Sequence, residues 1–133
     1  MIAETDSAIA AAGGPAVPES PGSVYRGVHA GHPALAAALQ GVVIPGKIDG
    51  TVAPEEHNRG DCSAISPYTS WTFDREIANS HADDFGPGGV ILRLPKTEPK
   101  PGDTWSWVES PDIYDEQEVL LRGERSGVTV ELL

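Results

Sequence analysis

Two glutamates separated by one residue give the clearest chemical signal in this sequence. Glu116 and Glu118 introduce an apolar run, residues 119–121, which predicts a strand from Glu116 to Arg122. Side chains at i and i+2 of a strand share a face, so the two carboxylates would lie together, with Cα atoms roughly 6–7 Å apart. Like charges this close cost free energy, and a solvated loop would normally spread them apart. A strand with one polar, solvated face is the alternative.

An arginine lies within an otherwise apolar strand near the start of the organised sequence. The valines and the tyrosine of residues 23–28 predict this strand, which contains Arg26 and Gly27. A guanidinium keeps its charge, so an arginine in such a strand needs an anion or a carboxylate as partner. Gly27 allows another group to approach the backbone closely. A surface strand with one exposed arginine is the alternative.

A third polar segment lies where a strand runs into a helix. Ser70, Trp71 and Thr72 precede Asp74, which is expected to cap a helix from Asp74 to about Ala82. Helix capping is the usual role of hydroxyls at this position, and it accounts for Thr72. It accounts less well for Ser70 and Trp71.

The order of these motifs resembles that in the mono-ADP-ribosyltransferase toxins of the Arg-Ser-Glu class. The family's Ser-Thr-Ser element is followed six residues later by a helix alanine. Thr72 and Ala78 keep this spacing, which sets Ser70, Trp71 and Thr72 on the element. The second and third positions depart from the commonest form, whereas the Glu-x-Glu strand fits closely. The resemblance covers residues 24–132.

The resemblance implies an α+β fold of the ADP-ribosyltransferase type. Two small packed β-sheets, flanked by short helices, would form an NAD cleft, and residues 23–133 would be the catalytic domain. NAD would be a substrate, and no metal would be needed. The enzyme would transfer ADP-ribose to a protein acceptor, an arginine side chain, and release nicotinamide.

The resemblance also implies how the chain would bind NAD. Arg26 would hold a phosphate and a ribose edge of NAD, and the main chain at Gly27 would meet the nicotinamide amide. Thr72 would belong to the same binding site. Trp71 or Phe73 would stack near the nicotinamide ring.

Three residues would carry the catalytic roles of the family. Ser70 would form a hydrogen bond with Glu118 and orient it. Glu118 would stabilise the oxocarbenium that forms as nicotinamide leaves. Glu116 would position or deprotonate the incoming guanidinium. Two alternatives stay open, namely an NAD glycohydrolase of the same fold and a non-catalytic acidic binding module.

The charge balance restricts the partners. The chain has 20 acidic and 9 basic residues, a net charge of −11, which argues against nucleic acid and anionic membranes as partners. Many acids lie in residues 98–118, and the resemblance places a target-recognition loop at residues 110–115. An acidic rim would suit a basic protein target with an exposed arginine, and a solvated acidic loop is the alternative. An immunity protein is a further possible partner.

The remaining sequence indicates one domain in 133 residues. Residues 1–22 are rich in Ala, Gly, Pro and Ser, which predicts a flexible linker or tail. A short helix is expected over residues 33–41, a long loop over 45–67, and strands over 90–94, 105–108 and 128–132, the last joined to its predecessor by a tight turn. No apolar run is long enough to span a membrane, and no secretory signal opens the chain. A secreted or delivered effector acting in a target-cell cytoplasm would take its delivery signal from outside this sequence.

The histidines and the cysteine give no chemical signal of their own. His29 and His32 are expected to be free surface residues, and His57 and His81 are isolated in the sequence, so no metal site is predicted. Cys62 is expected to be a packed small residue.

Overall fold

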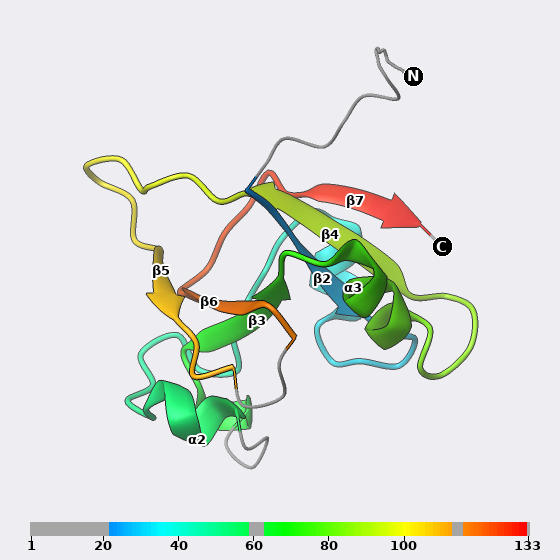
Figure 1. The fold of residues 1–133 in the computed structure, drawn as a ribbon, viewed down its shortest axis with the longest axis horizontal. Helices are drawn as coiled ribbons and strands as arrows, with labels where there is room; N and C mark the ends of the chain where they lie inside the picture. Colours follow the sequence, from blue (N-terminus) through cyan, green and yellow to red (C-terminus); the bar gives the residue numbers. More distant parts are fainter. Residues whose placement is uncertain (1–21, 59–62, 113–115, 133) are drawn as a thin grey trace.

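The computed structural model describes residues 22–58, 63–112 and 116–132, which form one six-stranded antiparallel sheet with short helices around it (Figure 1). The strand order is β5-β6-β3-β2-β4-β7. The strands are β2 (Ser23–Val28), β3 (Tyr68–Thr72), β4 (Val90–Pro95), β5 (Ser106–Glu109), β6 (Glu118–Arg122) and β7 (Thr129–Leu132). The helices are α1 (Leu35–Leu39), α2 (Pro54–Asn58), the 3-10 helix η1 (Ser63–Ile65) and α3 (Arg75–Ala82). The expected α+β class is therefore confirmed. The predicted tail, except Gly22, lies outside the described residues, as does Cys62.

The paired region between β2 and β3 is the shortest in the sheet. These strands pair through a single position, Tyr25 with Thr72, whereas β2 pairs with β4 along its whole length and β3 pairs likewise with β6. The sheet thus has two halves, β2-β4-β7 and β5-β6-β3, which run in different directions in Figure 1. Two separate packed sheets are not what the structure shows, because this one pair joins the halves into a continuous sheet.

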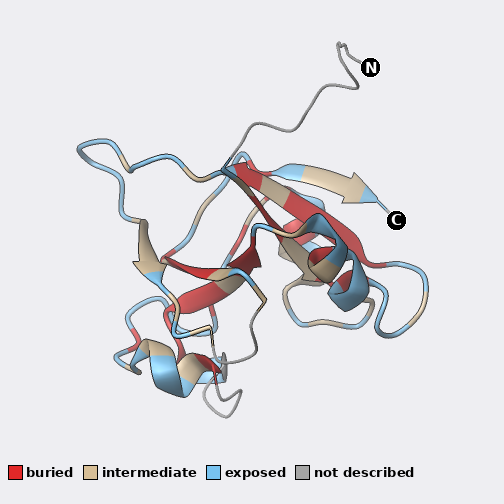
Figure 2. Cartoon of the chain, viewed as in Figure 1, coloured by how far each residue is buried: buried red, intermediate tan, exposed pale blue. Residues whose placement is uncertain are grey.

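The strands that meet at this junction consist largely of buried residues (Figure 2). The main core cluster joins the two halves through residues of β2, β3, β4 and β6, including Val24, Trp71, Leu92 and Leu121. On the other face, α3 packs against β2, and Ala78 and Ala82 join a second cluster with Tyr25 and Ile91. Burial of this apolar surface is the main favourable term that holds the two halves together.

Helix α3 depends on its cap and on a glycine in the neighbouring strand. As predicted, Asp74 is the N-cap, and its carboxylate accepts a hydrogen bond of 2.9 Å from the amide of Glu76. A Cβ atom at Gly27 would collide with the carbonyl oxygen of Ala78 and lie 2.7 Å from the amide nitrogen of Ala82. The close approach expected at Gly27 is therefore made by the backbone of α3. Phe73, which precedes this cap, is 40% exposed.

Three sequence-based assignments are wrong in detail. The segment 45–67 is not one loop, because it contains α2 and η1. Strand β6 begins at Glu118, so Glu116 lies outside it. Strand β7 is an edge strand that pairs with β4, whereas β6 lies in the other half of the sheet. Residues 123–127 therefore connect the two halves and do not close a hairpin. Within the described residues, no helix has the length and apolar character that a membrane span requires.

Candidate active site

A cavity of about 500 Å³ opens where the two halves of the sheet meet. Residues of β2, β3, α2, α3 and the start of β6 line it. Seven site residues predicted from the sequence are among them, namely Arg26, Gly27, Ser70, Trp71, Thr72, Glu116 and Glu118. The fold therefore brings the three motifs together in one place.

Arg26 lies on β2 and carries a partly buried positive charge. Its Nη1 donates a hydrogen bond of 3.2 Å to the carbonyl oxygen of Ser70. Burial lowers the pKa of Arg26 to about 10, and the nearby negative charge of Glu118 opposes this shift. Within the described residues, no carboxylate forms an ion pair with Arg26 at 4.0 Å or less. The guanidinium is therefore suited to bind an anion in the cavity.

Glu118 is held by a serine that the sequence reading did not single out for this role. Ser110 Oγ lies 2.5 Å from Glu118 Oε1 and donates its hydroxyl hydrogen to it. Ser110 Oγ also accepts hydrogen bonds from Asn58 Nδ2 at 3.0 Å and from the amide of Asp112 at 2.9 Å. Ser110 thus orients the carboxylate of Glu118. Ser70 Oγ is instead bonded to His57, and no hydrogen bond between Ser70 and Glu118 is present among the described residues, so the orienting role predicted for Ser70 stays a prediction.

Glu116 reaches the same cavity by a different backbone path. Gln117 has a φ of 52°, an unusual value for a residue with a side chain, so Glu116 and Glu118 are not i and i+2 of one strand. The end of β3 holds this turn through two hydrogen bonds. Thr72 Oγ1 donates one of 2.6 Å to the carbonyl oxygen of Glu116, and the amide of Phe73 donates the other to the carbonyl oxygen of Gln117. The same-face argument from the strand is therefore wrong, although both carboxylates do line one cavity.

Trp71 and Thr72 have structural contacts that leave little for a ligand. The side chain of Trp71 is only 1% exposed, packs in the core cluster and donates its Nε1 hydrogen to Thr69 Oγ1 at 3.0 Å. Alternation along β3 turns it to the face opposite Ser70. Thr72 Oγ1 already donates to Glu116 and accepts from the amide of Asp74. The stacking expected of Trp71 is not supported, and Phe73 is not among the residues that line the cavity.

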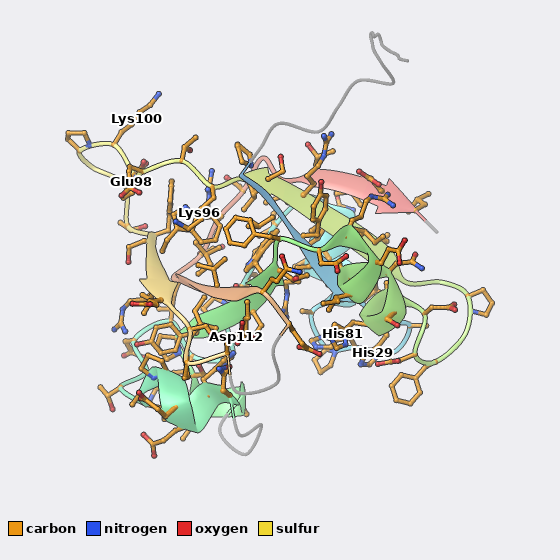
Figure 3. All side chains as sticks on the ribbon, in the orientation of Figure 1. His29, His81, Lys96, Glu98, Lys100 and Asp112 are labelled. Atoms are coloured by element: carbon orange, nitrogen blue, oxygen red, sulfur yellow. The ribbon has the colours of Figure 1, made fainter. Side chains whose placement is uncertain are left out.

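All four histidines of the chain line the cavity, although the sequence indicated unconnected residues. His29 and His32 have ring centroids 4.9 Å apart, and His29 also contacts the ring of Phe85 at 4.5 Å. Burial, and then the charge of Arg26, lower the pKa of His32 and of His57. His29 and His81, labelled in Figure 3, both line the cavity, and His81 lies near the end of α3. No spacing in the sequence relates these residues, so only the fold reveals them.

The histidines and acids do not form a recognisable metal centre in the part of the chain that the structure describes. No group of three or more His, Cys, Asp or Glu side chains is arranged there to hold a metal ion.

The expected acidic rim is divided between two places. Asp112 is bonded to a residue that lines the cavity, because its Oδ1 accepts a hydrogen bond of 2.8 Å from the amide of Glu116. Glu98 and Asp103 instead line a separate hollow with Arg125, and Figure 3 shows Glu98 on a loop that extends away from His29 and His81. Residues 113–115 of the predicted recognition loop lie outside the described residues. The described acids of this segment thus do not all face one site.

No family model matches the chain, and neither a curated protein nor a solved structure is significantly similar to it. The functional argument therefore depends on the geometry of the cavity and on the sequence motifs that line it.

Proposed function

We propose that this chain is a mono-ADP-ribosyltransferase, which transfers ADP-ribose from NAD to an arginine side chain of a protein and releases nicotinamide. The convergence of Arg26, Ser70, Glu116 and Glu118 on one cavity carries the proposal. Their segments, namely β2, β3 and the residues that lead into β6, are separate in sequence, and β2 meets β3 only at the junction of the two half-sheets. An ADP-ribosyltransferase-like fold, with NAD in the cleft at this junction, is part of the proposal.

The charges around the cavity suit a dinucleotide whose sugar becomes cationic. Arg26 offers a desolvated guanidinium to the diphosphate, and the lowered pKa values of His32 and His57 favour neutral imidazoles beside it. Glu118 offers a carboxylate, oriented by Ser110, to the nicotinamide ribose. This carboxylate would stabilise the oxocarbenium while the electron pair of the glycosidic bond leaves with neutral nicotinamide.

Transfer to arginine needs a second acidic group near the sugar. A guanidinium is a poor nucleophile while it is protonated, so a carboxylate must orient it and take its proton as the new C–N bond forms. Glu116 suits this role because it lines the same cavity and its side chain is 36% exposed, which leaves it accessible to a macromolecule. In this scheme NAD is a substrate, and no metal takes part.

The proposal has a direct test. Purified protein is incubated with labelled NAD and agmatine, a small guanidinium acceptor, and free ADP-ribose, ADP-ribosyl-agmatine and nicotinamide are quantified. We expect release of nicotinamide and formation of ADP-ribosyl-agmatine, and we expect both to be lost in Glu118→Gln. Absence of nicotinamide release from the folded wild-type protein would refute the proposed function.

One observation also favours an NAD glycohydrolase of the same fold. In the proposed scheme, cleavage of NAD depends on Arg26 and Glu118. Glu116, the proposed acceptor carboxylate, lies outside β6, and its Oε2 is 3.7 Å from Nε2 of His81. Water needs less assistance than a guanidinium to trap an oxocarbenium. In the agmatine assay, the glycohydrolase would give free ADP-ribose alone.

The net charge of −11 supports a basic protein as the target. We propose that the enzyme acts as a delivered effector in a target-cell cytoplasm. An immunity protein would protect the producing cell.

A further inference from the structure

His57 joins two serine hydroxyls across the wall of the cavity. It is the next-to-last residue of α2, and its Nδ1 lies 2.7 Å from Ser66 Oγ while its Nε2 lies 2.9 Å from Ser70 Oγ. Both distances are normal for hydrogen bonds. The side chain of Ser70 is therefore held by His57, and its main chain is held by Arg26.

The hydrogen bonds of Ser66 determine which nitrogen of His57 carries the hydrogen. Ser66 is fully buried, and its Oγ already accepts a hydrogen bond of 3.0 Å from the amide of Tyr68. If Nδ1 also donated to Ser66, the hydroxyl hydrogen of Ser66 would have no acceptor among the described residues. A buried donor without a partner is costly, so Ser66 donates to Nδ1. His57 is then neutral and carries its hydrogen on Nε2.

This tautomer fixes the direction of the Ser70 hydroxyl. Because Nε2–H donates to Ser70 Oγ, the hydrogen of Ser70 points away from His57 and is free to reach the cavity. Protonation of His57 at Nδ1 would break the hydrogen bond that Ser66 donates to this nitrogen. It would also place a positive charge near Arg26 of β2. The other described contact of the ring is edge-on with Tyr68 of β3, with centroids 5.9 Å apart. These surroundings favour the neutral ring, in agreement with its lowered pKa.

We infer that His57 is a positioning residue of the site, which as the neutral Nε2–H tautomer presents the hydroxyl of Ser70 as a hydrogen-bond donor to the bound ligand. The inference depends on the proposed function only for the identity of that ligand, whose sugar or phosphate oxygens would accept the hydrogen bond. It gives Ser70 a role that does not require contact with Glu118.

A matched pair of substitutions separates positioning from simple structural support. In His57→Gln the side-chain amide can replace Nε2–H and donate to Ser70, whereas in His57→Asn the shorter side chain can replace only Nδ1 and accept from Ser66. Each variant keeps one of the two hydrogen bonds, so both should lose similar stability. We expect kcat/KM for NAD to stay within about threefold of wild type in His57→Gln and to fall by about tenfold to a hundredfold in His57→Asn.

The control is Glu55→Gln, an exposed residue of the same helix, which should change neither activity nor stability. Thermal melting of all variants checks that they are folded. Equal loss of activity in both His57 variants, or no loss in either, would overturn the inference.

A second measurement needs no enzymatic activity. Long-range ¹H–¹⁵N spectra of the ligand-free protein distinguish the two neutral tautomers and the imidazolium, and we expect the Nε2–H form for His57 at pH 7.5. Detection of the Nδ1–H form or of the imidazolium would overturn the inference. If the wild-type protein released no nicotinamide, the proposed function would fail, and these spectra alone would still decide the state of His57.

Discussion

The cavity has two sides that are built very differently. On its inner wall, Arg26, Ser70 and Glu118 come from strands, and each is fixed by a hydrogen bond of 3.2 Å or less. On its outer rim, Glu116 and His81 are 36% and 50% exposed and are linked by a contact of 3.7 Å. Asp84, still more exposed, lies 3.9 Å from His81. The inner wall is preorganised, whereas the rim has freedom to adjust.

This difference suits the two halves of the proposed reaction. Breaking the glycosidic bond always involves the same dinucleotide, so a rigid wall loses little by fitting it closely and gains electrostatic stabilisation of the transition state. The proposed acceptor is a side chain on another protein, and its approach would benefit from exposed groups that can rearrange. The predictions below test this division between the inner wall and the rim.

The largest effect is expected on the inner wall, from Glu118→Gln. We expect NAD turnover to fall by about 100- to 1000-fold, because one preorganised electrostatic contact with the transition state is lost. Glutamine can still accept the hydrogen bond from Ser110, so the fold should persist. The loss of a negative charge near Arg26 should lower the stability slightly. Nicotinamide release measures the first effect and thermal melting the second; near-native turnover in the folded variant would remove Glu118 from the catalytic site.

On the rim, Glu116→Gln should separate the two halves of the reaction. Transfer to agmatine should fall by about 100-fold, the scale of general-base assistance, while slow hydrolysis of NAD continues. The measurement is the ratio of ADP-ribosyl-agmatine to free ADP-ribose. If transfer proceeded normally, the acceptor role of Glu116 would be wrong. Equal loss of transfer and hydrolysis would place Glu116 on the inner wall, and arginine would no longer be the expected acceptor.

The sequence predicts the parts of this site that depend on local pattern. Helix α3 follows from its cap at Asp74, and β2 follows from its valines and tyrosine. Arg26 is therefore found on the predicted strand, and Ser70 on a strand that runs into the predicted helix. Gln117 illustrates the limit, because a positive φ in a residue other than glycine has no local signal. The path of the Glu116 backbone therefore differs from the regular strand that its sequence suggests.

The supporting residues were not predicted because tertiary contacts alone bring them to the site. Helix α2 has five residues, too few for an apolar periodicity, and its segment was expected to be a loop. His57 bonds a serine 13 positions away, and Asn58 bonds one 52 positions away. The pairing of β7 with β4 is non-local in the same way, whereas the glycines of residues 123–127 suggest a hairpin.

A smaller effect is expected from Arg26→Lys, which retains the charge but removes the planar fork of donors. Lysine would lose the hydrogen bond to the Ser70 carbonyl and could not contact two phosphate oxygens side by side. We expect kcat/KM for NAD to fall by about tenfold or more, since a hydrogen bond to a charged group is worth about 1.5–3 kcal/mol. The balance between transfer and hydrolysis should not change, because Arg26 belongs to the inner wall. Unchanged NAD kinetics would show that its charge serves the strand and not the ligand.

The smallest effect concerns the stability of the inner wall as a function of pH. Burial lowers the pKa of His57 below its ordinary value of 6.5, and the charge of Arg26 adds to the shift. Below about pH 6.5 the unfolded chain therefore binds a proton at this residue that the folded chain does not yet bind. The stability contributed by neutral His57 is present above that pH and is lost as the pH falls towards the lowered pKa. His32 has the same direction of shift and contributes in the same range.

We expect the urea midpoint to fall between pH 7.5 and pH 5.5 in the wild type, and to fall less in His57→Gln, which cannot bind this proton. An equal fall in both proteins would show that His57 is not a desolvated group of the inner wall.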